Sequence, residues 1–504
     1  MTPGRGVAGG AATGVTVFAL ALLLPSTVGV GLQMDEGAVV AYASEVLDGG
    51  LPHRDFLTFY GPVNPWIVAA AFVVAGESVA TERVVGLLYR LVIVLSLFVL
   101  GLRLGGLLAG VLSGVVAAWL MSEELVWAYS TYGALAFGLL AVVLAAVAAG
   151  RAQDERAKLL FLAAGAAGGI SVLVRFDFAP AVFVSALPFL APVPSRLRAW
   201  YGVGLVLTSA IYVPHLALVG WSRVERLLVD ISVAGRERRL PLPSVVEEPG
   251  ALLAASAVAS VGFVVLGAIL SRRGEREGGP LLFALGLFSC ALAPLALFRA
   301  DLVHVRPFAV VPLSLLPAVV LFIIGRPGWV GPRVRAAMTV VVAAAAVLPA
   351  FYDGDTKLQR AEDLRGIRTA ERGFYDDDSP GAPAVVERAR TLAEPGDRLF
   401  VGMKDLRRAE YVPTYMYFLL RDLEPASYYM EMNPGAANRE GSGLADELRR
   451  ADWIILTTEY DFRRDSDELG PNEPNEVVRD LFCLQLRSGD YYLYGRCRSR
   501  AETW

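Results

Sequence analysis

The stretch LQMDEGAVVAYASEVLDGGLPHRDFLTFYGPVNPW, from Leu32 to Trp66, follows directly after the first long apolar run of the chain. It opens with an acidic pair, Asp35 and Glu36. Further ionisable side chains follow among glycines and prolines: His53, Arg54, Asp55 and Tyr60. Ionisable groups at a membrane are costly, so they point to function. This stretch therefore predicts a membrane protein whose first loop carries chemistry.

The composition of the whole chain agrees with this prediction. Hydrophobic residues make up 55% of its 504 residues, whereas soluble proteins contain about 45–50%. The net charge of -4 gives no indication of nucleic-acid binding. The three cysteines show no CxxC or Cys/His spacing of a zinc site.

Eleven apolar runs are candidates for membrane-spanning helices, since about 20 residues cross the hydrocarbon core. They cover roughly 11–32, 84–104, 106–121, 131–150, 157–174, 176–192, 199–219, 250–270, 280–298, 305–325 and 333–351. The third and sixth are short. The apolar piece at 65–76 is shorter still, so we expect an interfacial or re-entrant helix there.

The basic loops predict the orientation of these spans. The loops at 150–158, 195–198, 271–277 and 325–335 fall on one side when the spans are counted in order. Short basic loops are typical of the cytoplasmic side. We therefore expect a multi-pass protein of the cell membrane with a cytoplasmic N-terminus and an extracytoplasmic C-terminus.

From about residue 352 the sequence becomes polar. It predicts two domains: a transmembrane domain of residues 1–351, with an outer loop at 33–83, and a small α/β domain of residues 352–504 on the outer face. Strands are expected at 397–403, 452–458, 482–488 and 491–497, and helices at 382–394 and 442–451. Cys483 and Cys497 flank the last hairpin. Whether they form a disulfide stays open at this point.

Ionisable residues gather on the predicted outer side. They include Arg175 with Asp177, Arg236 in the loop 221–243, and Arg299, Asp301, His304 and Arg306 between two late spans. Arginine suits phosphate because its planar fork donates two parallel hydrogen bonds. A neighbouring carboxylate can take a proton from an attacking hydroxyl. Together they indicate a lipid-phosphate substrate whose head group reacts outside the membrane.

The first loop also carries a pattern of small and ring-bearing residues after its acidic pair: Gly50, Pro52, Asp55, Phe56, Gly61, Pro62, Pro65 and Trp66. With the "MDEG" motif, the "TERVVGLLYRL" start of the second span and the outer α/β domain, the sequence resembles the membrane glycosyltransferases of the GT-C class. Within that class it resembles the protein O-mannosyltransferase and aminoarabinose-transferase group. The layout matches across nearly the whole chain, and the residue pattern matches mainly at 33–90.

The resemblance implies a polytopic helical fold and an inverting transfer of a sugar from a polyprenyl-phosphate donor. Asp35 corresponds to the catalytic base of that group, with Glu36 assisting it. The arginines would hold the phosphate as it leaves. The acceptor would be a glycan, lipid or protein hydroxyl, and the transferred group a hexosyl or pentosyl unit. No spacing demands a cofactor, although a divalent metal near Asp35 and Glu36 would be compatible with the acids.

Each of these residues also has a plain structural interpretation. Acids are favoured in the first turn of a helix, which would account for Asp35 and Glu36. The segment from His53 to Asp55 would suit a surface turn, and Tyr60 an interfacial anchor. Arg175 and Asp177 would form an ion pair, and Arg236 would meet anionic lipid head groups.

Three other functions remain as alternatives. A lipid-linked sugar flippase or other transporter usually has polar residues at the membrane midplane, and the spans here are plain. An oligosaccharide ligase or polymerase would use a lipid diphosphate. A receptor or assembly protein would leave the acidic pair without a role.

Overall fold

The computed structural model describes residues 4–27, 34–227, 230, 239–326, 330–364, 380–409, 412–459 and 469–497. By their contacts the residues divide into two units. Unit 1 contains residues 1–29, 83–214 and 240–365, and unit 2 contains residues 30–82, 215–239 and 366–504. The division of the chain at residue 351 stays a prediction.

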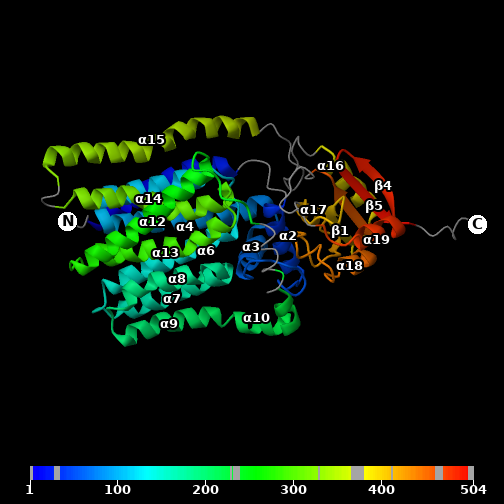
Figure 1. Cartoon of the computed structure of the whole chain (residues 1–504), viewed down its shortest axis with the longest axis horizontal. Coiled ribbons are helices and arrows are strands. Elements are labelled where there is room, and N and C mark those ends of the chain that lie inside the picture. Colours follow the sequence, from blue (N-terminus) through cyan, green and yellow to red (C-terminus); the bar gives the residue numbers. More distant parts are fainter. Residues whose placement is uncertain are drawn as a thin grey trace, which may run out of the picture. The chain divides into compact units, whose positions relative to one another are not determined.

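Unit 1 is built from long apolar helices that pack side by side (Figure 1). They are α1 (Arg5–Leu23), α4 (Val79–Gly105), α5 (Leu107–Ser122), α6 (Ser130–Ala149), α7 (Arg156–Val174), α8 (Ala179–Leu190), α9 (Ser195–Ser209), α12 (Glu248–Arg272), α13 (Gly278–Phe298), α14 (Leu302–Ile324) and α15 (Pro332–Leu364). The 3-10 turns η1 (Pro25–Thr27) and η2 (Phe176–Phe178) follow α1 and α7.

The described residues contain nine helical stretches that are long and apolar enough to cross a membrane. One of them, Ser195–Val219, joins α9 to α10 (Tyr212–Val219). The two remaining predicted spans are also helices, but α5 has 16 residues and α8 has 12. The predicted polytopic helical fold is therefore confirmed. The two short helices, α5 and α8, correspond to the third and sixth apolar runs, which the sequence also showed to be short.

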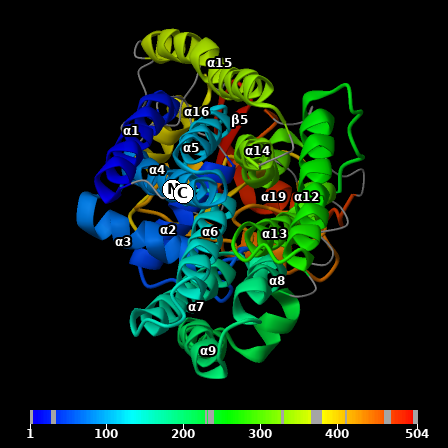
Figure 2. The ribbon, with the colours of Figure 1, turned by 90° about the vertical axis from the view of Figure 1, so that its left-hand side faces the viewer.

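Close packing in unit 1 depends on small residues where helices meet. Figure 2 shows α7 between α6 and α9, and α13 between α12 and α8. Between α7 and α9, a side chain at Gly165 would collide with the Tyr201 carbonyl oxygen, and one at Gly204 with that of Leu162. Glycines thus let these two backbones approach, as small residues do between membrane helices.

Unit 2 contains a five-stranded sheet in the order β2-β1-β3-β5-β4. Its strands are β1 (Arg398–Met403), β2 (Glu424–Pro425), β3 (Trp453–Thr457), β4 (Phe482–Ser488) and β5 (Tyr491–Arg496), with β1 parallel to β2 and β3 and the remaining pairs antiparallel. Four strands lie where the sequence predicts them. The helices of this part are α16 (Ala382–Leu392), α17 (Tyr415–Leu419), α18 (Leu444–Arg450) and α19 (Glu473–Leu481).

The first-loop residues belong to unit 2 as well and form α2 (Asp35–Leu47) and α3 (Val63–Ala75). The Leu57 amide donates to the Tyr428 carbonyl oxygen at 2.7 Å. Arg421 pairs with Asp48 at 3.1 Å and with Glu77 at 2.8 Å. The loop is therefore anchored to the sheet-containing part of the chain by both backbone and charge.

The last hairpin contains a disulfide between Cys483 and Cys497, whose Cα atoms lie 5.0 Å apart. Strand β4 changes register against β5 between Leu484 and Leu486. The bridge answers the question that the sequence left open. Cys483 lies opposite Gly495 in the sheet, and the register of a regular hairpin without this bulge would differ by one residue.

Candidate active site

The acidic pair lies in the first turn of α2, where the helix dipole favours negative charge. Asp35 is half-buried, and Glu36 is fully buried at 0% exposure. Gly37 packs against the backbone of Tyr415, so the start of this helix is closely held. The position agrees with both interpretations of the pair, as a helix start and as catalytic groups.

His53 is the most constrained of the predicted site residues in the first loop. It is 1% exposed and adopts a φ of 70°, a left-handed conformation that is uncommon for a residue with a side chain. Its Nε2 lies 2.9 Å from the Tyr60 carbonyl oxygen, so this nitrogen carries the proton, and its Nδ1 lies 3.0 Å from Nε2 of His215. Burial lowers the pKa of His53 to about 4. His53 is therefore a neutral link between the loop and α10.

The neighbouring Arg54 and Asp55 are exposed and satisfy each other, with Nη2 and Oδ2 2.7 Å apart. Asp55 also accepts the Leu51 amide at 2.7 Å. Burial opposes ionisation of Asp55, but these hydrogen bonds lower the pKa of its carboxyl. This geometry is that of a surface turn.

At one end of unit 1, Arg175 and Asp177 form a two-pronged ion pair with nitrogen–oxygen distances of 2.5 and 3.0 Å. Arg175 is only 7% exposed and also donates to the Thr131 hydroxyl at 2.5 Å. Arg175 thus connects the segment that follows α7 with the first turn of α6 through Thr131.

A second predicted group lies between α13 and α14. Arg299 donates to Asp301 at 2.7 Å, and the other oxygen of Asp301 contacts Nδ1 of His304 at 2.6 Å. Burial opposes ionisation, but the contacts with His304 and Arg299 lower the pKa of Asp301 to about 2. Asp301 also caps α14 by accepting the His304 amide.

Arg306 joins this link to other helices. Its Nη1 donates to the Glu123 carbonyl oxygen at 3.1 Å and lies 3.7 Å from Oε1 of Glu124, while its Nη2 donates to Glu248 at 3.0 Å. Glu124 in turn accepts the Tyr132 hydroxyl at 3.0 Å. Burial raises the pKa of Glu124 to about 7, although Arg306 and Arg90 act against the shift.

Arg90 is a candidate site residue that the sequence interpretation missed. It is fully buried at 0% exposure and donates to the carbonyl oxygens of Trp127 at 2.9 Å and Leu125 at 3.0 Å. Its guanidinium also lies 4.3 Å above the Tyr132 ring. An arginine inside an apolar run is itself a functional signal, and so are the adjacent acids Glu123 and Glu124. Both signals were present in the sequence.

Three sets of contacts lie at one end of unit 1, which we name the arginine end: Arg90, Tyr132, Glu124 and Arg306; Thr131, Arg175 and Asp177; and Arg299, Asp301 and His304. The predicted residues Asp35, Glu36, His53, Arg54, Asp55 and Tyr60 belong to unit 2. Arg236 lies outside the described residues. Across the described part of the chain, no three His, Cys, Asp or Glu side chains lie close enough together to hold a metal ion.

Solved structures with a similar fold cover nearly the whole chain. ArnT from Cupriavidus metallidurans, bound to undecaprenyl phosphate, matches with a TM-score of 0.59 and 15% identity over 99% of each chain. AglB, the oligosaccharyltransferase of Archaeoglobus fulgidus, in complex with an inhibitory peptide and a dolichol-phosphate, matches with a TM-score of 0.56 and 11% identity over 98% of this chain and 74% of that one. The GT-C fold that the resemblance implied is thus confirmed. No protein-family description and no curated protein matches the sequence.

Proposed function

We propose that this chain is an inverting glycosyltransferase that moves a sugar from a polyprenyl-phosphate donor to an acceptor hydroxyl at the outer face of the membrane. The observation that carries the proposal is the arginine end, where buried arginines and acids gather at one end of a GT-C helix bundle. Charged groups at such a position are costly and point to an anionic substrate.

In the proposed reaction Asp35 accepts the proton of the acceptor hydroxyl, whose oxygen attacks C1 of the sugar from the face opposite the phosphate. The bond between C1 and the phosphate oxygen breaks, and the phosphate leaves with an additional negative charge. Glu36 assists this base. The arginines accelerate the reaction only as far as they bind the departing phosphate more tightly than the intact donor.

The ion pairs of the arginine end suggest how a donor phosphate is received. Arg306 is shared between Glu124, Glu248 and a backbone carbonyl, so no single carboxylate holds its fork. Glu124 takes up a proton near neutral pH because its pKa is raised to about 7. Protonation of Glu124 removes one of the two carboxylate charges beside Arg306, while Glu248 stays paired with it, and so favours an anionic phosphate at this position.

The disulfide supports the outward orientation of unit 2. Disulfides persist in oxidising compartments and are rare in the cytoplasm. The bridge between Cys483 and Cys497 therefore favours an extracytoplasmic location for the sheet and, with it, for the acidic pair of the same unit.

The test is sugar transfer from radiolabelled polyprenyl-phosphate sugars by the purified protein, with membrane and cell-wall extract as acceptor. We expect Asp35→Asn to lower turnover by at least 100-fold, the range of a lost general base. Asp48→Asn is the matched control, since it removes an exposed acid from the other end of α2. Equal turnover of Asp35→Asn and the wild type would contradict the assignment of the base.

The likeness to AglB, an oligosaccharyltransferase, raises a second candidate, transfer of a whole oligosaccharide. An oligosaccharide ligase or polymerase of the kind considered from the sequence would use a lipid diphosphate. The same assay with lipid-diphosphate donors distinguishes the two. Release from diphosphates alone would favour the ligase or polymerase, and translocation in vesicles without release would favour a flippase.

A further inference from the structure

A pocket of about 470 Å³ lies at the other end of unit 1, which we name the pocket end. Here α4, α6, α8 and α12 end and α13 begins. The wall comes from all five of these elements. Residues of three loops that the sequence predicts on the cytoplasmic side, 150–158, 271–277 and 325–335, lie at this end. Gly150 and Glu275 line the pocket, and Arg326 pairs with Glu275 at 2.8 Å.

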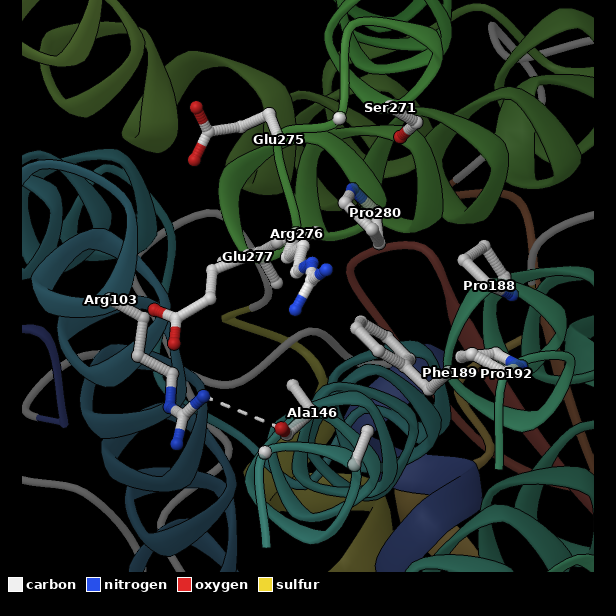
Figure 3. A pocket seen from close by; sticks show the side chains of 14 residues that line it. Arg103, Ala146, Pro188, Phe189, Pro192, Ser271, Glu275, Arg276, Glu277 and Pro280 are labelled. Atoms are coloured by element: carbon white, nitrogen blue, oxygen red, sulfur yellow. Dashed lines mark hydrogen bonds between the residues drawn. The ribbon is translucent and has the colours of Figure 1, made fainter. Parts of the chain in front are cut away.

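One side of the pocket is charged. Arg103 donates to the Ala146 carbonyl oxygen at 3.3 Å, and this is its one hydrogen bond within the described residues. Arg276 forms no hydrogen bond or ion pair with any residue that the structure describes, and Figure 3 shows its side chain projecting toward the middle of the pocket. Glu277 lies near Arg103, whereas Glu275 is neutralised by Arg326. Guanidinium groups therefore remain available to an anion.

The other side is apolar and is formed mainly by Pro188, Phe189 and Pro192 (Figure 3). The helices next to it carry exposed apolar side chains toward the same end. Leu187 of α8 is 58% exposed, and Ile269 of α12 is 42% exposed. In a chain of this fold such side chains face lipid, so the pocket borders a surface that suits hydrocarbon tails.

We propose that this pocket binds the phosphodiester head group of a membrane phospholipid. The forks of Arg103 and Arg276 match phosphate oxygens, Glu277 offers a partner to an amine on the head group, and the proline and phenylalanine rings contact the start of the tails. The volume lies within the usual range of about 300–1,000 Å³ for small-ligand sites. Basic pockets between membrane helices on the cytoplasmic side bind lipid head groups in this way. The inference stands independently of sugar transfer.

The experiment compares phospholipid retained by purified full-length protein, measured by native mass spectrometry after exchange into detergent. The double variant Arg103→Gln/Arg276→Gln removes both forks. Arg272→Gln/Arg273→Gln is the matched control, because these exposed arginines lie at the end of α12 but do not line the pocket. Ala149→Phe is a second variant that fills the pocket and keeps its charges.

We expect the wild type and the control to retain a phospholipid, and the pocket variant to bind it about 100-fold more weakly, about tenfold for each guanidinium. Ala149→Phe also loses the lipid, which decides the question if the double variant fails to fold. Equal retention in both double variants, or full retention in Ala149→Phe, would overturn the proposal. Displacement of the lipid by millimolar inorganic phosphate would show a free-phosphate site instead.

Discussion

The two ends of unit 1 use arginine in opposite ways. At the arginine end, Arg90, Arg175 and Arg299 are at most 7% exposed and each is held by partners within the protein. At the pocket end, Arg272, Arg273 and Arg276 are exposed. The pocket end follows the composition expected of cytoplasmic loops. Arg90, Arg175 and Arg299 of the arginine end are buried and paired instead, so the rule that places exposed arginines in cytoplasmic loops does not account for them.

The burial of an arginine in a membrane protein therefore says more about its role than the number of arginines does. An exposed arginine beside a span sets orientation at little cost. A buried one requires partners, since an unpaired buried charge is strongly unfavourable. The carboxylates and carbonyl oxygens around Arg90 and Arg306 meet that requirement.

The largest expected effect is on stability, from Arg90→Leu. This change removes the donor to the Leu125 carbonyl oxygen and one of the two donors to that of Trp127, which keeps the Tyr129 amide, and it removes the cation above Tyr132. We expect a loss of about 3 kcal/mol, measured as thermal unfolding in one detergent. Arg276→Leu at the pocket end should leave the unfolding temperature nearly unchanged. Equal losses in both variants would remove the contrast between the ends.

The next effect concerns sugar transfer. Arg306→Gln removes a guanidinium that contacts Glu123, Glu124 and Glu248. We expect turnover to fall on the order of 100-fold, the usual effect of losing one donor to a developing negative charge. Arg272→Gln, measured in the same assay, should keep full turnover. A full-strength Arg306→Gln enzyme would place the donor phosphate elsewhere.

A pH-dependent effect is expected from Glu124. Its pKa is about 7 in the folded protein against 4.5 in the unfolded chain, so the folded state binds the proton more tightly. Glu124 therefore reduces stability as the pH rises from 4.5 through 7. Relative to wild type, Glu124→Gln should gain stability above pH 7 and show no gain below pH 4.5, measured by unfolding between pH 4 and 8. The same pH dependence in both proteins would show that Glu124 titrates normally.

The smallest effect is expected from Arg54→Ala. Arg54 and Asp55 form an exposed pair, and such pairs contribute little because water screens them. The free energy of unfolding should change by less than about 0.5 kcal/mol, and the turnover of sugar transfer should stay unchanged. A marked loss of turnover would assign Arg54 to the donor or the acceptor instead of to a surface turn.

Much of this fold could be predicted from sequence because the signals are local. Apolar runs marked the helices, alternation marked four strands, and the short pairs Arg175–Asp177 and Arg299–Asp301 lie two residues apart. Counting the spans in order correctly placed the segments around Gly150, Glu275 and Arg326 at one end of the unit.

The contacts that escaped prediction join distant parts of the chain. His53 meets His215 across 162 positions, and Arg306 meets the Glu123 carbonyl across 183. Arg90 was overlooked although an arginine within a span is itself a signal, because two of its partners are backbone carbonyl oxygens, which no side-chain pattern reveals. Such pairings depend on how helices pack, which a single sequence does not specify.

The most direct test of the central claim is to locate the donor phosphate. A polyprenyl-phosphate analogue with a photoreactive group beside its phosphate would be crosslinked to the purified protein, and the labelled peptides identified by mass spectrometry. We predict labels at the arginine end, within 123–132 and 299–306, which decrease in Arg306→Gln. Labels confined to the pocket end, within 271–281, would contradict the proposed site of sugar transfer.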